Sequence, residues 1–189
     1  MTPHLFLGFG GNIGDVRNNF RSAISKLEDS DHFEIFAVSS AYQTRALTVN
    51  GVDDKEPRYW NIVVNAACDL SAPDLLAFCK NLERESGRLE SAPRWTSRTL
   101  DIDILAWGAL SVDSVSLKIP HAQCLRRSFV LAPWNEVAPT FQLSIEQGNT
   151  RVTDAWTRLQ SSRGHASEIL EVDRGWFGGS QSQSWKDRR

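Results

Sequence analysis

The feature that most constrains this chain is a short segment, from Leu100 to Ile104, in which polar and apolar residues alternate. A period of two is typical of a β-strand, so Leu100, Ile102 and Ile104 face one side while Asp101 and Asp103 face the other. Residues two apart on a strand lie about 6.5–7 Å from each other. The segment therefore predicts a strand with one apolar face and a pair of carboxylates on the opposite face.

This carboxylate pair is a candidate metal site. Two ionised carboxylates at that spacing repel each other unless cations lie between them. Magnesium ions bridged by a polyphosphate suit the spacing, because Mg²⁺ takes one or two carboxylates together with substrate phosphates. Arg94 and Arg98 precede the pair on a predicted loop, and their guanidinium groups can donate paired hydrogen bonds to phosphate oxygens. A solvent-facing strand with ordinary surface charges has the same spacing, and spacing alone does not decide between the two.

A glycine-rich segment ends the apolar run from His4 to Gly10, which itself predicts a buried strand. The glycines permit a tight turn, and Asp15 is placed to cap the following helix. That helix is predicted by an apolar stripe at helical spacing: Val16, Phe20, Ala23, Ile24 and Leu27. The segment matches neither G-x-x-x-x-G-K-[ST] nor G-x-G-x-x-G, so it predicts a structural turn rather than a nucleotide loop.

The middle of the chain predicts two further strands and a helix. Residues 33–42 and 59–68 are rich in aromatic and β-branched residues, whereas 44–58 lacks periodicity and predicts a long loop. In the second strand Asn61 and Asn65 share one face, which either contacts the edge of a heterocycle or is simply exposed to solvent. The helix has a capping serine, an apolar stripe and a terminal glycine: Ser71, then Leu75, Phe78, Cys79 and Leu82, then Gly87.

The last third of the chain has weaker patterns. Residues 115–119 and 142–147 predict short strands, and residues 152–159 predict a brief helix. Residues 161–189 are rich in Ser, Gly, Gln and Arg, so we expect one domain over 1–160 and a polar, flexible tail over 161–189. The tail contains three aromatic residues, which dock either on the domain or on a partner: Trp176, Phe177 and Trp185.

Composition limits the classes of function. A net charge of −2 gives no global positive field for nucleic acid or a membrane surface, and no apolar run is long enough to span a bilayer. The three cysteines lack metal-binding spacing, and no secretory signal precedes them, which indicates free thiols in a reducing cytoplasm. We therefore expect a cytoplasmic protein without nucleic-acid or membrane partners. We further expect a monomer that acts on small molecules.

Several ordered segments, from about Leu5 to Pro139, resemble the 6-hydroxymethyl-7,8-dihydropterin pyrophosphokinase family of folate biosynthesis. The resemblance rests on residues 10–15, 39–44, 59–61, 83–88, 94–95, 98–105, 120–121 and 127–133. The family implies a ferredoxin-like α+β sandwich, a mainly antiparallel sheet with helices packed on its faces. The predicted strand–helix–strand–strand–helix–strand order agrees with that fold.

The resemblance implies an enzyme that transfers pyrophosphate from ATP to the pterin hydroxymethyl group and releases AMP. It implies two Mg²⁺ ions held by Asp101 and Asp103. Its implied pterin contacts are Thr44, Leu47, Tyr59, Asn61, Trp95 and Phe129. Its implied ATP-side contacts are Glu83, Arg88, Arg94, Arg98, Ile104, His121 and Arg127, of which Arg88, Arg98 and His121 are the implied catalytic groups.

The chain departs from the family pattern at several positions: Gly11, Ala46, Thr48, Thr96, Ser97 and Ala122. These departures leave a second hypothesis open, a divergent paralogue that binds pterin or nucleotide with a regulatory role or altered specificity. A ferredoxin-like RNA-binding module is disfavoured, because the strands lack a paired aromatic signature and the net charge is negative.

Overall fold

The computed structural model describes residues 3–48, 51–53, 55–87, 97–145, 148–162 and 169–177. Its main sheet is built from β1 (Leu5–Gly11), β2 (Phe33–Val38), β3 (Ala41–Thr44), β6 (Tyr59–Cys68), β7 (Asp101–Trp107) and β12 (Ile169–Asp173). The strand order is β12-β3-β6-β1-β7, with β2 paired to the second half of β6, and all of these pairs are antiparallel.

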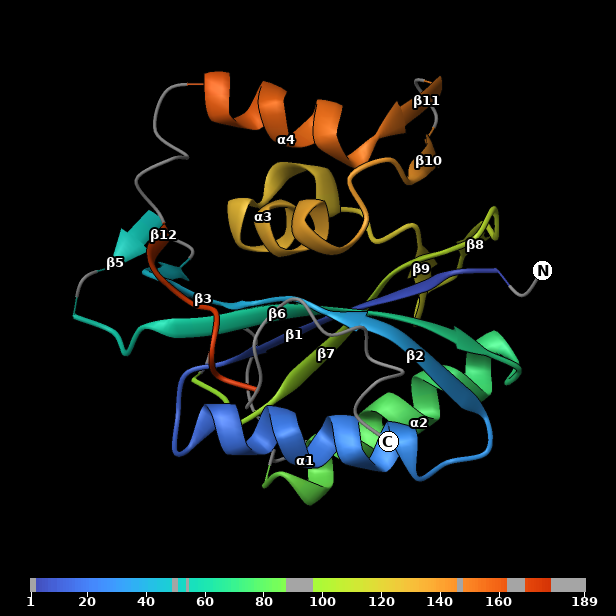
Figure 1. Ribbon diagram of the computed structural model, residues 1–189, viewed down its shortest axis with the longest axis horizontal. Coiled ribbons are helices and arrows are strands. Elements are labelled where there is room, and N and C mark those ends of the chain that lie inside the picture. Colours follow the sequence, from blue (N-terminus) through green and yellow to red (C-terminus); the bar gives the residue numbers. More distant parts are fainter. Residues whose placement is uncertain are drawn as a thin grey trace.

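Helices cover both faces of the sheet (Figure 1). They are α1 (Val16–Glu28), α2 (Ala72–Glu85), α3 (Ser128–Val137) and α4 (Val152–Ser161), with a 3₁₀ turn, η1 (Cys124–Arg126). α1 and α2 lie on one face, whereas α3 lies on the other with α4 packed outside it. None of the helices among the described residues is long and apolar enough to cross a membrane.

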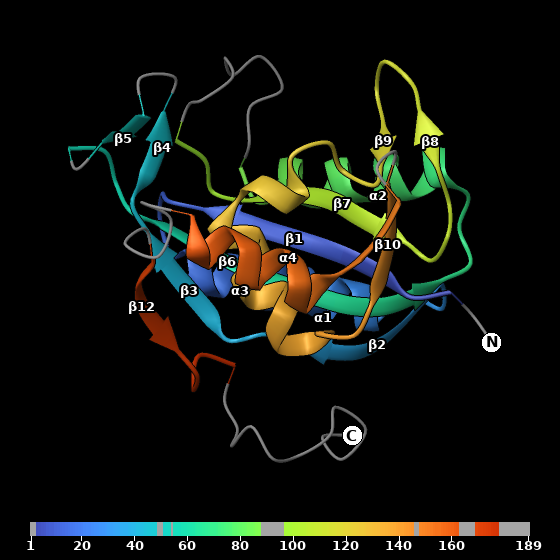
Figure 2. The same cartoon turned by 90° about the horizontal axis from the view of Figure 1, so that it is seen from above.

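Three small hairpins decorate this sandwich: β4 (Ala46–Thr48) with β5 (Gly51–Asp53), β8 (Val112–Asp113) with β9 (Lys118–Ile119), and β10 (Gln142–Ile145) with β11 (Gly148–Arg151). Seen from above, the β4–β5 and β8–β9 hairpins project on the same side of the molecule as β7, one near each end of that strand (Figure 2). They therefore flank the part of the sheet that α3 leaves uncovered.

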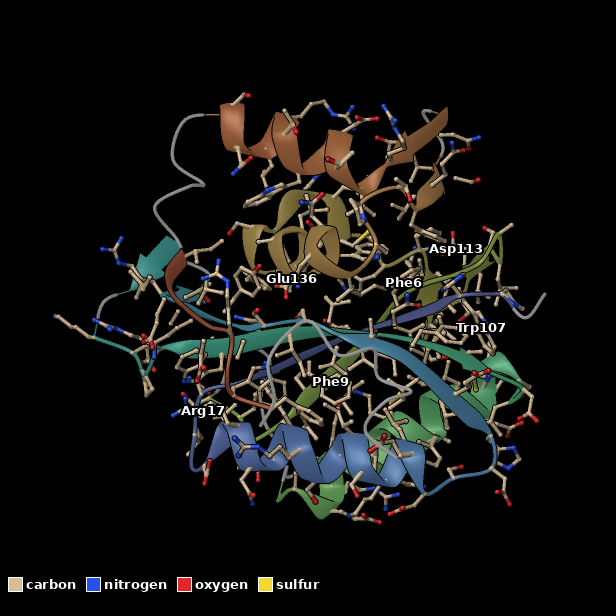
Figure 3. The ribbon with its side chains drawn as sticks, in the orientation of Figure 1. Phe6, Phe9, Arg17, Trp107, Asp113 and Glu136 are labelled. Carbon is tan, nitrogen blue, oxygen red and sulfur yellow. The ribbon has the colours of Figure 1, made fainter. Side chains whose placement is uncertain are left out.

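The alternation along β1 divides the interior into two cores. Phe9 points toward α1, and Phe6 points toward α3 (Figure 3). The predicted stripe of the first helix is the face that α1 buries, and Asp15 caps it by accepting a hydrogen bond of 3.1 Å from the backbone of Asn18. The second predicted helix is also confirmed, because Ser71 caps α2 and Gly87 follows it with φ +89°. The order of the strands and helices, together with helices on both faces of the sheet, confirms the predicted ferredoxin-like α+β sandwich.

The structure corrects the single strand predicted over 33–42. β2 ends at Val38, and β3 begins at Ala41. Between them the backbone N–H of Ser39 donates to the Val63 carbonyl (3.0 Å), and the Ser39 hydroxyl accepts from the Val63 N–H (2.9 Å). The Ser39 side-chain oxygen thus replaces a backbone acceptor for β6. The segment between β2 and β3 therefore stays bonded to β6 although the strand is interrupted.

Two further expectations are wrong in detail. The loop predicted over 44–58 contains the β4–β5 hairpin, whose three-residue strands are too short to show periodicity. Of the strand predicted over 115–119 only the last two residues, Lys118 and Ile119, are in β9. The sequence also did not predict α3, because residues 130–134 are consecutive and all buried, so they show no alternation of buried and exposed positions that would reveal a helical period.

Part of the segment expected to be a tail belongs to the main sheet. Residues 169–173 form β12 and extend the main sheet beside β3, and the side chain of Trp176 is only 3% exposed. Within the expected tail, residues 169–177 are therefore packed on the domain. Residues 178–189, including Trp185, lie outside the described residues.

Candidate active site

A cavity of about 640 Å³ opens on the α3 side of the sheet and reaches around β7 to α2. Most of the predicted site residues that the structure describes line it: Thr44, Tyr59, Asn61, Arg98, Asp101, Asp103, Ile104, His121, Arg127 and Phe129. They come from β3, β6, β7, α3 and the loops before β7 and after β9. The tertiary fold thus collects in one place residues that are up to 85 positions apart in the chain.

A row of cross-strand neighbours crosses the floor of this cavity. Tyr42 on β3 is opposite Asn61 on β6, Asn61 is opposite Gly10 on β1, and Gly10 is opposite Asp101 on β7. Neighbouring strands lie about 4.8 Å apart, so Asn61 and Asp101 are separated by roughly 10 Å across one glycine. An amide and a carboxylate therefore face the same space from two strands, with an open gap between them.

Two glycines on β1 keep that gap open. Gly8 is opposite Val63 on one side and Asp103 on the other. A Cβ at Gly8 would touch the side chain of Leu105 at 3.2 Å, and a Cβ at Gly10 would lie 3.4 Å from the Asn61 side-chain oxygen. Side chains at these positions would therefore fill the floor between the amide and the carboxylates.

The two strand asparagines are buried, not exposed to solvent. Asn61 and Asn65 are each 6% exposed, so the alternative of a solvated strand face is excluded. The amide N–H of Asn61 donates to the Thr44 hydroxyl at 3.1 Å, and the Asn65 oxygen contacts His4 Nδ1 at 2.9 Å. Only Asn61 lines the cavity, so the two amides have different surroundings on the same strand face.

The carboxylate pair lies at the far side of the floor. Asp101 forms an ion pair with Arg98, and both side chains are partly exposed. Burial raises the pKa of Asp103, the negative charge of Asp101 raises it further, and His121, Arg127 and Lys80 oppose both effects. The site therefore holds a destabilised negative charge that a cation would stabilise. Among the described residues no cluster of three or more His, Cys, Asp or Glu forms a complete metal site.

The loop that carries Arg98 is fixed by the glycine-rich turn. The Asn12 side-chain oxygen accepts from the Arg98 backbone N–H at 2.7 Å, and the Asn12 backbone donates to the Arg98 carbonyl at 2.9 Å. A Cβ at Gly11 would lie 2.7 Å from the Thr99 carbonyl oxygen, a distance that real Cβ atoms do not adopt. The turn therefore orients the cationic loop by close backbone contact, as expected of a structural turn.

Among the described residues predicted on the ATP side, Glu83 is the one that does not line the cavity. Its carboxylate is 1% exposed and accepts from the Ile102 backbone N–H at 2.8 Å and from Lys80 Nζ at 2.8 and 2.9 Å. Burial is the main cause that raises its pKa. Glu83 thus joins α2 to β7, and Lys80, one turn earlier on α2, lines the cavity instead.

The opposite wall comes from the segment after β9 and from α3. The His121 backbone donates to the Leu105 carbonyl at 2.9 Å, and its Nδ1 accepts from the Gln123 N–H at 3.3 Å, which leaves Nε2 to carry a proton. The Arg127 guanidinium lies 5.6 Å from the centre of the Phe129 ring. Burial raises the pKa of Tyr59, which lies across the cavity on β6.

Some of the predicted site residues cannot be placed. Arg88, Arg94 and Trp95 lie outside the described residues, and Leu47 is described only as part of the β4 backbone. Sequence reasoning missed Lys80 and the two floor glycines as site residues. Lys80 is three residues before Glu83, a helical spacing that places both on one face, and this spacing was the available signal.

Comparison with known proteins finds a matching family and similar chains. Residues 6–139 match the family described as 7,8-dihydro-6-hydroxymethylpterin-pyrophosphokinase (HPPK). The 2-amino-4-hydroxy-6-hydroxymethyldihydropteridine pyrophosphokinase of Bacillus subtilis is 32% identical over 92% of this chain and 99% of its own length. The protein of that name from Synechocystis is 37% identical over 70% of this chain.

The fold has solved relatives, and some relatives are longer. A crystal structure of Plasmodium falciparum HPPK-DHPS covers 90% of this chain with a TM-score of 0.65 and 13% identity. This chain spans 44% of that chain, 65% of the Synechocystis protein and 32% of an Arabidopsis thaliana folate synthesis bifunctional protein, to which it is 30% identical. The structural likeness, at this low identity, concerns the fold alone.

Proposed function

The chain belongs to the 7,8-dihydro-6-hydroxymethylpterin-pyrophosphokinase family, and on that premise we propose that it transfers pyrophosphate from ATP to the hydroxymethyl group of the dihydropterin. The observation that carries the proposal is the row from Asn61 across Gly10 to Asp101. A flat heterocycle at the amide end directs its hydroxymethyl group over the glycine toward the carboxylates. The phosphates of ATP then occupy the carboxylate end.

The amide end suits a pterin. Its ring edge alternates donors and acceptors, and a carboxamide such as Asn61 can do both. The Asn61 N–H is held by Thr44, which fixes the orientation of the amide and leaves its oxygen toward Gly10. Tyr59 and Phe129 line the same cavity and supply aromatic faces for stacking. Binding in this pocket would exclude water from one side of the ring.

The carboxylate end suits Mg²⁺ bridged by phosphates. Asp101 and Asp103 would hold it. Burial and the nearby negative charge of Asp101 raise the pKa of Asp103, and a bound cation would oppose both effects. Magnesium takes few protein ligands and completes its shell from phosphates and water, so an incomplete protein donor set fits it. When bound, it supplies positive charge that polarises the reacting phosphate oxygens. The number of ions, two, is part of this proposal.

The chain supplies further positive charge around the phosphates. Arg98, Lys80 and Arg127 line the cavity, and the His121 Nε2 proton is available to an oxygen. Phosphoryl-type transfer needs in-line positioning and neutralised charge more than covalent help. These residues therefore act by holding the β- and γ-phosphates and by stabilising the negative charge that remains on AMP.

A second candidate is the divergent paralogue that binds pterin or nucleotide with a regulatory role or altered specificity, and Ala46 and Ala122 are among the departures that favour it. Neither alanine replaces a residue of the row from Asn61 across Gly10 to Asp101. Ala122 is exposed at the rim of the cavity, and Ala46 is buried in β4. Asn61, Asp101, Asp103, Arg98 and His121 line the described cavity, and their presence supports the enzyme over the paralogue.

The test is release of AMP from ATP and Mg²⁺, measured with and without 6-hydroxymethyl-7,8-dihydropterin. The proposal predicts AMP release only with the pterin, together with formation of its diphosphate ester. Pterin binding without AMP release would support the paralogue. Absence of binding of both ligands would overturn the assignment of the cavity. Omission of Mg²⁺ and its replacement by Ca²⁺ test the metal separately.

We propose that a single chain works in a reducing compartment. The described residues that we propose to carry the transfer line one cavity of this chain. All three cysteines are free and buried, which agrees with a cytoplasmic protein.

A further inference from the structure

Residues 169–177, here called the strap, lie after the part of the chain that matches the family, which ends at residue 139. The strap begins with β12, which pairs antiparallel with β3: Ile169 is opposite Thr44, and Asp173 is opposite Ala41. In both views β12 runs along the outer side of β3 (Figures 1 and 2). The strap therefore covers the edge of the sheet nearest to the Asn61 end of the cavity.

The end of the strap is anchored under the sheet by Trp176. Its indole packs edge-on against Phe20 of α1, with ring centres 6.0 Å apart, and its N–H donates to the Ser39 carbonyl at 3.0 Å. Arg21 donates to the Trp176 carbonyl, and Arg17, one turn earlier on α1, forms an ion pair with Asp173 of β12. The strap is thus fixed to α1 and to the junction between β2 and β3.

β3 depends on this anchor because it is short. Its inner edge pairs with β6 through three residues, Tyr42, Gln43 and Thr44, and its outer edge pairs with β12. A four-residue strand with one edge unpaired exposes its backbone donors and acceptors and frays readily. The strap therefore supplies about half of the backbone pairing that holds β3 in place.

β3 in turn holds two parts of the cavity. The Thr44 hydroxyl accepts the hydrogen bond from Asn61 on the floor. The Tyr42 hydroxyl donates to Glu136 of α3 at 2.8 Å, and Ser40 donates to the same carboxylate through its N–H at 3.0 Å and its hydroxyl at 2.9 Å. Glu136 lies on α3 facing the sheet (Figure 3), and α3 also carries Phe129. β3 therefore links the strap to the amide and to one aromatic wall.

We infer that Trp176 is a positioning residue for the pterin end of the site: it holds β3, and through β3 the Thr44–Asn61 pair and α3. This inference rests on the proposed function. The carboxylate strand β7 is at the opposite end of the strand order from β12, with β3, β6 and β1 between them. Loss of the anchor therefore weakens pterin binding and leaves nucleotide binding nearly unchanged.

The experiment uses full-length variants. Trp176→Ala removes the anchor, and Trp176→Phe keeps a ring against Phe20 but removes the donor to Ser39. Trp107→Ala is the matched control, because Trp107 is also buried (7% exposed) but lies on β7, at the opposite edge. Calorimetry gives the dissociation constant of hydroxymethyl dihydropterin at saturating non-hydrolysable ATP analogue with Mg²⁺, and of the analogue alone.

We expect Trp176→Ala to raise the pterin dissociation constant on the order of tenfold, as couplings through packed neighbours do, and to change that of the ATP analogue less than about twofold. Trp176→Phe should lie between Trp176→Ala and wild type. Hydrogen exchange at residues 41–44 should be faster in Trp176→Ala than in Trp107→Ala at matched stability. Because Trp176→Phe retains most of the packing, the comparison survives if the alanine variant folds poorly.

The outcomes separate this inference from the proposed function. Equal loss of both ligands in Trp176→Ala, or the same pterin loss in Trp107→Ala, would mean that the tryptophan only stabilises the fold and would overturn the positioning role. Unchanged pterin affinity in Trp176→Ala would overturn it as well. If the wild-type protein binds no pterin, the proposed function itself fails, and this inference fails with it.

Discussion

The carboxylate of Glu83 on α2 accepts a hydrogen bond of 2.8 Å from the backbone N–H of Ile102, the residue between the two aspartates of β7. β7 is the last strand in the order of the main sheet, so this bond satisfies a donor at its outer edge. It also holds the carboxylate strand against the helix that brings Lys80 to the cavity.

The first prediction concerns this bond. Glu83→Ala should lower the free energy of unfolding by about 1–3 kcal/mol, because the Ile102 N–H is left buried without its acceptor. Glu83→Gln keeps an oxygen for Ile102 and should cost less. Urea unfolding of both variants measures the difference. Equal losses for Ala and Gln would show that the interaction with Lys80, not the backbone bond, matters.

The second prediction concerns the metal. Asp101→Asn and Asp103→Asn should each lower AMP release by about two orders of magnitude or more, because the bound metal supplies several kcal/mol of charge stabilisation. Asp113→Asn is the matched control: this aspartate pairs with Lys118 and does not line the cavity. Steady-state assays across Mg²⁺ concentrations, with circular dichroism for the fold, provide the measurement. Near-normal turnover of either variant at saturating Mg²⁺ would contradict the assignment.

The third prediction concerns the pterin. Asn61→Ala should weaken pterin binding by about 1–3 kcal/mol, because polar atoms of the bound ring lose their partner, and should spare the ATP analogue. Asn65→Ala removes the same group from the same strand face, equally buried, but outside the cavity. Calorimetry on the two variants compares them directly. Similar pterin losses in both would mean that the effect comes through the strand and not through contact.

The fourth prediction concerns the close contact at the glycine turn. Gly11→Ala places a Cβ 2.7 Å from the Thr99 carbonyl oxygen and should destabilise the fold by about 1–3 kcal/mol through displaced backbone. Gly175→Ala is the control, since the nearest atom to its Cβ is 3.9 Å away. Thermal unfolding measures both. An unchanged melting temperature for Gly11→Ala would show that the loop of Arg98 shifts freely.

The fifth prediction concerns the thiols. Burial raises the pKa of Cys79 and of Cys124 to about 12, and it raises the pKa of Cys68 above its usual value. The thiolate is the reactive form, so at pH 8 the native protein should react slowly with a thiol reagent such as DTNB. All three thiols should react at once in denaturant. Rapid modification of the native protein would contradict the buried, free state of these residues.

The sequence by itself determined the elements whose pattern is local. The alternation around Asp101, the stripe and cap of α1 and the strand at 59–68 were predicted correctly, because one buried face imposes a period that is visible in the residues themselves. Together with the resemblance of several motifs, these elements were enough to predict the fold class and the carboxylate pair.

Only the tertiary structure decided which residues meet. α3 has no visible period because residues 130–134 are consecutive and all buried, and the β2–β3 break depends on a bond between Ser39 and Val63, 24 residues apart. The hydrogen bond from the Ile102 N–H to Glu83 also depends on the tertiary structure, because the donor and the buried acceptor belong to β7 and α2. The sequence did not show where Trp176 packs, because its partners Ser39 and Phe20 are far from it in the chain and are brought together only by folding.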